Sequence, residues 1–87
     1  MLPHPAPRRE RLAVPELRLG GVPLVVSLWL VPGGASVAAG DRVVELVAGG
    51  VTIDLEAPVA GRLVARHADE DDVVTAGTVI AEFEVDA

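Results

Sequence analysis

Short apolar runs separated by turn-forming residues make up the chain from Leu24 onward. The turn residues are glycines, a proline–glycine segment and an aspartate-rich run, and no stretch places apolar residues at helical spacing. Short strands at such close intervals are typical of small all-β barrels and sandwiches. The run Val43–Val47 is too apolar for simple alternation, which predicts a strand covered on both faces. The predicted strands are 12–17, 24–31, 42–48, 51–55, 62–66 and 79–85.

The second half of this pattern repeats the first at an offset of 37 residues. The matched segments are 24–31 with 61–68, Val37–Gly40 with Val74–Gly77, and Val43–Leu46 with Ile80–Phe83. A chain rich in alanine, valine and glycine matches itself by chance in places, but the shared glycine and glutamate positions favour a true repeat. Two equivalent halves related by a pseudo-twofold axis predict a flattened barrel or sandwich of two small antiparallel sheets.

The length of 87 residues allows one domain. Residues 1–10 contain three prolines and a cluster of charge, and we expect them to form a disordered lead-in. Residues 11–87 then form the single folded domain.

Charge and composition exclude several classes of partner and chemistry. The net charge of −6 argues against nucleic acid and anionic membrane as partners, and the absence of cysteine excludes disulfides and thiol chemistry. No apolar stretch approaches the ~20 residues of a membrane helix, and no apolar segment follows the N-terminal arginines as in a signal peptide. We therefore expect a cytoplasmic protein. All seven basic residues are arginines, so the sequence contains no lysine side-chain amine.

The polar residues do not form a recognisable catalytic or metal site. The two histidines, His4 and His67, lack the partners of a hydrolytic triad, and His67 is expected to be a surface imidazole at a strand end. The acidic run Asp69–Asp72 lacks the ligand spacing of a calcium loop and predicts a solvated turn. Trp29 lies on an apolar strand and is expected to pack rather than to bind a ligand. We therefore predict no catalytic residue and no metal site.

Several motifs in a fixed order resemble the lipoyl/biotinyl carrier domain. This is the small all-β domain, a barrel-sandwich hybrid, of the acyltransferase component of 2-oxo acid dehydrogenase complexes, and biotin carboxyl carrier domains are its wider relatives. Each motif alone is weak, but their order and spacing over residues 12–85 are fairly specific. The motifs are Val14–Leu17, Ser27–Val31, Gly34, Val37–Asp41, Glu45–Leu46, Asp54–Gly61 and Ala68–Gly77.

The resemblance implies that the attachment site of the prosthetic group has been lost. In the family, the modified lysine stands four positions before an acid that matches Asp54, and an aspartate precedes that lysine. These two positions fall on Gly50 and Gly49, and a family glutamate falls on Val47. A Gly-Gly pair also suits a two-residue hairpin turn, because both central residues of a type I′ turn have φ > 0. We therefore expect a degenerate attachment hairpin at Gly49 and Gly50, with no lipoate or biotin attached.

Three functions remain open, and none of them is enzymatic. The first is a non-catalytic protein-interaction module that binds subunits of 2-oxo acid dehydrogenase or carboxylase complexes. The second is a structural or oligomeric module of the membrane-fusion adaptor type, although the sequence predicts neither the helical hairpin nor the membrane anchor of such proteins. The third is a carrier that binds its prosthetic group noncovalently.

Overall fold

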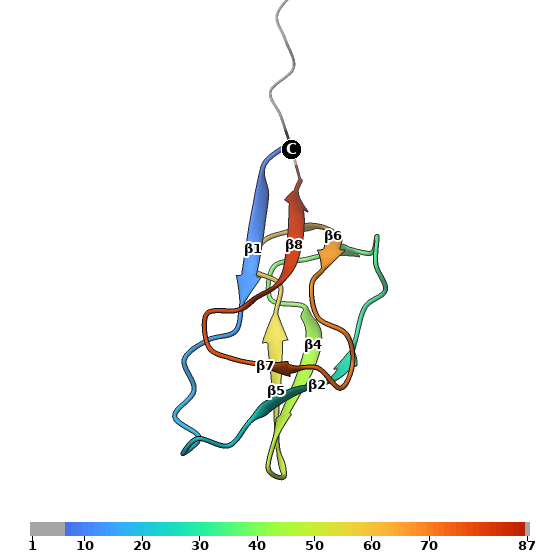
Figure 1. Cartoon of the computed structure of the whole chain (residues 1–87). Helices are drawn as coiled ribbons and strands as arrows, with labels where there is room; N and C mark the ends of the chain where they lie inside the picture. Colours follow the sequence, from blue (N-terminus) through green and yellow to red (C-terminus); the bar gives the residue numbers. More distant parts are fainter. Residues whose placement is uncertain (1–6, 87) are drawn as a thin grey trace, which may run out of the picture.

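A computed structural model describes residues 7–86, which form eight β-strands and no helix (Figure 1). The first strand begins at Arg9 and the last strand ends at Val85. The strands are β1 (Arg9–Ala13), β2 (Leu24–Trp29), β3 (Ser36–Val37), β4 (Arg42–Ala48), β5 (Val51–Glu56), β6 (Gly61–Arg66), β7 (Val73–Val74) and β8 (Val79–Val85).

The strands form two four-stranded antiparallel sheets. The first sheet, here called sheet A, has the order β1-β8-β6-β3, and the second, sheet B, has the order β5-β4-β2-β7. Each sheet therefore contains strands from both halves of the chain. This architecture confirms the predicted flattened sandwich of two small antiparallel sheets.

The internal repeat extends to the finest details of strand pairing. Adding 37 to the bounds of β2, β3 and β4 gives the bounds of β6, β7 and β8. The register shift between Val26 and Leu28 in the β2–β4 pair recurs between Leu63 and Ala65 in the β6–β8 pair. Equivalent bulges at equivalent positions are difficult to obtain by chance, so the pseudo-twofold axis inferred from the sequence relates the two sheets.

One segment departs from the repeat. β5 corresponds to β1 at an offset of 43 rather than 37, as the equivalent backbone hydrogen bonds from Val14 N to Thr78 O and from Ala57 N to Asp41 O indicate. The difference arises in the connections, because residues 14–23 join β1 to β2 whereas only residues 57–60 join β5 to β6. The first half of the chain thus contains six additional residues in one loop, here called the long loop (14–23).

The space between the sheets is filled almost entirely by aliphatic side chains. Phe83 is the only aromatic residue in the buried core, and within residues 7–86 no polar or charged side chain is buried. Core residues occur as pairs that the repeat relates, such as Leu46 with Phe83 and Val26 with Leu63, all 0% exposed. Each sheet therefore covers the apolar face of the other, and the two cannot be separated without exposing the whole core.

The first strand begins earlier than the sequence predicted. The strand expected at 12–17 is β1 at Arg9–Ala13, so the last two residues of the expected lead-in belong to sheet A. Val14 still bonds to the neighbouring loop through Thr78 and Gly77, but Pro15 has no N–H to extend the ladder. Residues 1–6, including His4, lie outside the described residues. Elsewhere, the predicted strands 42–48 and 79–85 match β4 and β8, the other strand ends agree with prediction to within two residues, and the two-residue strands β3 and β7 were not predicted.

The β4 strand is not covered on both faces, so that prediction is wrong. A register shift between Arg42 and Val44 in the β4–β5 ladder allows the consecutive residues Val43 and Val44 to face the core together. After this bulge the strand alternates, and Val47 lies half-buried on the outer face. A bulge therefore produced the long apolar run that resembled a doubly covered strand.

His67 follows the end of β6 and forms an ion pair on the outside of sheet A, as expected for a surface imidazole. Its Nε2 atom lies 2.6 Å from Oε2 of Glu82 on β8, and its side chain is 46% exposed. The hydrogen bond from His67 lowers the pKa of Glu82 below its usual value of 4.5; desolvation opposes the shift, and the charges of His67, Arg9 and Arg11 add to it. Ionised Glu82 is thus favoured in the folded chain.

A lowered pKa in the folded state makes Glu82 stabilising above its ordinary pKa, and this stabilisation is lost as the pH falls through the lower folded value. We predict that Glu82→Gln lowers the thermal midpoint at about pH 6, and that the gap to the unchanged protein narrows as the pH is lowered below the ordinary pKa of a glutamate. Thermal unfolding monitored by circular dichroism measures the gap at each pH. Glu56→Gln is the control, because Glu56 is exposed and forms no ion pair within residues 7–86. A gap that stays constant with pH, or an equal effect of the control, would contradict the role of the Glu82 carboxylate.

Candidate functional site

The β4–β5 hairpin ends in a two-residue turn formed by Gly49 and Gly50. Ala48 pairs directly with Val51, so only the two glycines lie between the strands. Their φ angles are +54° and +86°, as a type I′ turn requires at both central positions. Figure 1 shows this turn at the opposite end of the domain from the start of β1 and the end of β8. The hairpin tip therefore lies away from the start of β1 and the end of β8.

The two glycines differ in their surroundings. A Cβ atom added at Gly49 would lie 3.5 Å from Cγ1 of Val22, which is an ordinary van der Waals contact with the long loop. A Cβ atom added at Gly50 would have no neighbour within 4 Å. Position 50 thus offers room for a long side chain directed into solvent, although the present chain has none there.

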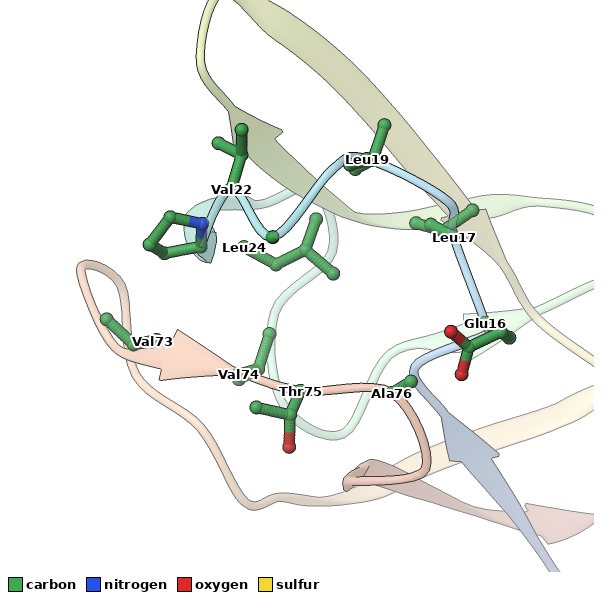
Figure 2. A pocket seen from close by; sticks show the side chains of 11 residues that line it. Glu16, Leu17, Leu19, Val22, Leu24, Val73, Val74, Thr75 and Ala76 are labelled. Atoms are coloured by element: carbon green, nitrogen blue, oxygen red, sulfur yellow. The ribbon is translucent and has the colours of Figure 1, made fainter.

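The long loop and β7 enclose a shallow apolar groove, which is drawn in Figure 2. Its volume is about 450 Å³, and Leu24 lies between the loop and β7. Glu16 is the only charged residue that lines it. The lining residues are Glu16, Leu17, Leu19, Gly21, Val22, Pro23, Leu24, Val73, Val74, Thr75 and Ala76. Because Val22 also approaches Gly49, the groove and the hairpin tip form one continuous region.

Sequence reasoning did not identify this groove. Leu17 is the last residue of the predicted strand 12–17, and Leu19 and Val22 flank the Gly20-Gly21 pair, which was interpreted only as a break before the next strand. The change of the repeat offset from 37 to 43 was the available signal, because six additional residues in one half must form a structure that the other half lacks. In sheet A, Gly61 is the repeat equivalent of Leu24. A Cβ atom added at Gly61 would lie 2.1 Å from the backbone O of Glu84. Sheet A therefore has no room for a side chain at the position where sheet B has Leu24 in its groove.

The other residues considered from the sequence have structural roles. Trp29 is half-buried, donates a hydrogen bond from Nε1 to the Ala68 carbonyl at 3.0 Å, and lies under the Arg66 guanidinium at 5.4 Å from the ring centre. Asp69–Asp72 is an exposed turn, closed by a 2.8 Å hydrogen bond from Asp69 N to Asp72 Oδ2. Among residues 7–86, no three histidine, aspartate or glutamate side chains gather as a metal site would require.

Comparison with known proteins identifies the family. The profile of the biotin–lipoyl family, described as "Biotin-requiring enzyme", matches residues 13–83. The chain belongs to the biotin–lipoyl family. The domains of this family are carrier-type domains, in agreement with the resemblance drawn from the sequence. No helix in the described part of the chain has the length and apolar character needed to cross a membrane.

Individual relatives of this biotin–lipoyl domain belong to larger enzymes and complexes. The chain is 35% identical over 70 residues to the dihydrolipoyllysine-residue acetyltransferase component of the pyruvate dehydrogenase complex of Corynebacterium glutamicum. This match covers 80% of the chain, but the chain spans only about a tenth (10%) of that relative's length.

Two solved structures show the same fold. A single-chain, multi-domain long-chain acyl-CoA carboxylase matches with a TM-score of 0.74 and 24% identity, over 99% of this chain and 8% of that one. The lipoyl domain of the 2-oxoglutarate dehydrogenase complex of Azotobacter vinelandii matches with a TM-score of 0.69 and 18% identity, over 84% of this chain and 92% of that one. At these identities, the two structures support the all-β fold, whereas the equivalence of Gly50 and the family's lysine stays a prediction.

Backbone strain provides a test of the turn. We predict that Gly49→Val lowers the free energy of unfolding by about 1 kcal/mol or more, because a β-branched residue is strained at φ > 0. The measurement is chemical denaturation. Gly33→Val is the matched control, since Gly33 is also a turn glycine with open space around it but has no positive φ. Equal unfolding midpoints for Gly49→Val and the unchanged protein would refute the requirement for glycine at the tip.

Proposed function

We propose that this biotin–lipoyl domain is a protein-interaction module that carries no covalently attached lipoate or biotin. The observation that supports this proposal most strongly is the Gly49-Gly50 turn, which lies at the tip of an intact hairpin in a sequence without lysine. Amide attachment requires a nucleophilic amine at the hairpin tip. The arginines are no substitute, because a guanidinium stays protonated and is a poor nucleophile. The domain has no role as an enzyme in this proposal.

The proposed partners are subunits of a 2-oxo acid dehydrogenase or carboxylase assembly, in a cytoplasmic setting. The relatives described above belong to a pyruvate dehydrogenase complex, a 2-oxoglutarate dehydrogenase complex and an acyl-CoA carboxylase. A domain that retains this fold without an acceptor side chain can still present the same outline to proteins that bind carrier domains. It would then act as a scaffold or a competitor rather than as a carrier.

The groove beside the tip raises the alternative of a carrier that holds its prosthetic group noncovalently. Its apolar lining of leucine, valine and proline suits the aliphatic part of such a molecule. However, free lipoate and free biotin are carboxylates, and the only charged group lining the groove is the carboxylate of Glu16. Like charges oppose this binding, so the groove favours contact with a protein over capture of a free acid.

Mass spectrometry tests the absence of modification. When the protein is coexpressed with a lipoate-attaching or biotin-attaching enzyme and supplied with cofactor, we predict that its intact mass does not change, because no lysine amine is present. A lipoyl domain that carries the family's lysine, expressed in the same cells, is the positive control. A mass increase that maps to any internal residue would contradict the proposal.

Restoring the acceptor tests whether the hairpin tip is the former attachment site. We predict that the double variant Gly49→Asp/Gly50→Lys becomes a substrate for lipoylation, at least weakly, and that Gly50→Lys alone is a poorer substrate. Both new side chains fit, since position 50 is open and position 49 has only an ordinary contact with Val22. The positive φ angles should cost about 1 kcal/mol of stability in total.

The chain provides a matched control for this variant. Gly20 and Gly21 form a second pair with positive φ angles, +66° and +79°, and open surroundings. Gly20→Asp/Gly21→Lys therefore introduces the same residues into a similar backbone at a different place, and it should remain unmodified. If neither folded double variant is lipoylated where an ordinary lipoyl domain is fully modified, the assigned register is wrong or recognition has been lost beyond the tip. Val47→Glu, at the position of the family glutamate, is then the next change to test.

A further inference from the structure

The pseudo-twofold repeat pairs every outward position of sheet B with an equivalent position of sheet A. Two cross-strand rows on the outer faces are fully defined by the strand registers. In sheet B the first row is Val73–Val25–Val47–Thr52, which crosses β7, β2, β4 and β5. The equivalent row in sheet A is Ser36–Arg62–Glu84–Arg9, which crosses β3, β6, β8 and β1. The same backbone thus carries an apolar row on one side of the molecule and a charged row on the other.

The charged row of sheet A is internally compensated. Glu84 lies between two arginines in the register, and Nη2 of Arg62 is 3.9 Å from its Oε1 atom. Opposite charges on directly paired strand positions stabilise a sheet in water. Sheet A therefore has an outer face suited to solvent.

The apolar row of sheet B has no such compensation. Val73 is 66% exposed, and Val25 and Val47 are half-buried although they face outward. Val73 also lines the groove of the long loop, so the row and the groove join into one apolar surface. Contiguous exposed apolar surface of this kind marks a contact site for another molecule more often than a solvated face.

The next row differs in charge in the same way. In sheet A it contains Arg11 opposite Glu82, and His67 also pairs with that glutamate. In sheet B the equivalent residues are Asp54 and Glu45, two carboxylates directly opposite each other. Nη1 of Arg42 lies 3.8 Å from Asp54 Oδ2, but no cation within residues 7–86 forms an ion pair with Glu45. Like charges at paired positions destabilise the isolated sheet, and an external cation would relieve this repulsion.

From these two rows we propose that the outer face of sheet B is a docking surface for a basic amphipathic helix of a partner protein. At a strand spacing of ~4.8 Å the three valines span about 10 Å, and Thr52 extends the row to about 14 Å, which matches about ten residues of helix at ~1.5 Å each. Leucine-type side chains of the helix contact Val73, Val25 and Val47, and arginine or lysine on one flank neutralises Glu45 and Asp54. A second copy of this chain fits less well, because two such acidic faces repel each other.

This inference rests on the proposed function in that it gives the interaction module its contact surface and the chemistry of its partner. Modification and docking are nevertheless measured separately. If the protein stays unmodified but the helical peptide does not bind at sheet B, only the proposed docking surface is refuted. If the protein is lipoylated or biotinylated but the peptide still binds at sheet B, only the proposed absence of modification is refuted.

The test is nuclear magnetic resonance titration of the whole chain with a defined probe. The probe is a synthetic 15-residue helical peptide with leucines at positions 1, 5, 8 and 12, arginines along one flank of that stripe and alanines elsewhere; the control peptide has glutamates in place of the arginines. We expect amide shifts at Val25, Glu45, Val47 and Val73 with the basic peptide, smaller shifts at Arg62 and Glu84, and at least about tenfold weaker binding of the acidic peptide.

The repeat supplies matched variants. Val25→Arg/Val47→Glu copies the sheet A row onto sheet B and should weaken binding of the basic peptide about tenfold while the fold is retained, since sheet A tolerates these residues at the equivalent positions. Glu45→Arg tests the charge alone and should abolish the preference for the basic peptide, because the new arginine would pair with Asp54 as Arg11 pairs with Glu82 in sheet A. Arg62→Val/Glu84→Val is the control and should leave binding at sheet B unchanged.

Several results would overturn the proposal. These are shifts that concentrate on sheet A, equal affinity for the basic and acidic peptides, or unchanged binding by folded Val25→Arg/Val47→Glu. Concentration-dependent shifts at Val25 and Val47 without any peptide would show that a second copy of the chain occupies the face, which would also overturn the basic-helix assignment.

Discussion

The mutual burial of the two sheets' inner faces is the interaction on which the rest of the molecule depends. Each sheet has only four short strands, and within residues 7–86 no helix or further strand besides its pseudo-symmetric counterpart covers its apolar face. The aliphatic core that they share contains no buried polar side chain among residues 7–86, so stability comes from close packing rather than from buried hydrogen bonds or ions. This constraint explains why equivalent core positions are apolar and buried in both halves, for example Leu46 with Phe83 and Val43 with Ile80.

The same constraint leaves the outward positions free to differ. An outward residue contacts solvent and its cross-strand neighbours, so it can change without disturbing the shared core. Sheet A has used this freedom to form a ladder of alternating charge, whereas sheet B has acquired an apolar row and facing carboxylates. The six additional residues of the long loop enlarge the apolar surface on the sheet B side only. The long loop, the apolar row and the facing carboxylates therefore distinguish the sheet B side of this nearly symmetric domain.

Much of the fold was predictable because the constraint of a shared core appears twice in the sequence. The offset of 37 residues and the glycines of the turns gave the strands, the two-sheet architecture and the tip at Gly49-Gly50. The bulge beside Val43 was not predictable, since an apolar run reads the same whether a strand is buried on both faces or shifted in register. The early start of β1 was missed because Arg9-Glu10-Arg11 looks like a solvated tail until its cross-strand partners on β8 are known. The groove and the outer rows depend on residues distant in sequence, and they became visible only when the registers were in place.

The glycine turn at the hairpin tip and the uncompensated outer face of sheet B would both suit a domain that stays bound to a partner. A carrier domain must leave each active site after delivering its group, so strong binding through its surface would oppose its task. A domain without an acceptor amine has no group to deliver, and a longer residence time on a partner no longer interferes with turnover. Exposed valines and two carboxylates that face each other are unfavourable on a free surface, and a partner that covers the valines and brings cations to the carboxylates relieves both costs. The Gly49-Gly50 turn fixes the alignment of β4 and β5, and this alignment sets Val47 opposite Thr52 and Glu45 opposite Asp54 on the face that we propose for docking.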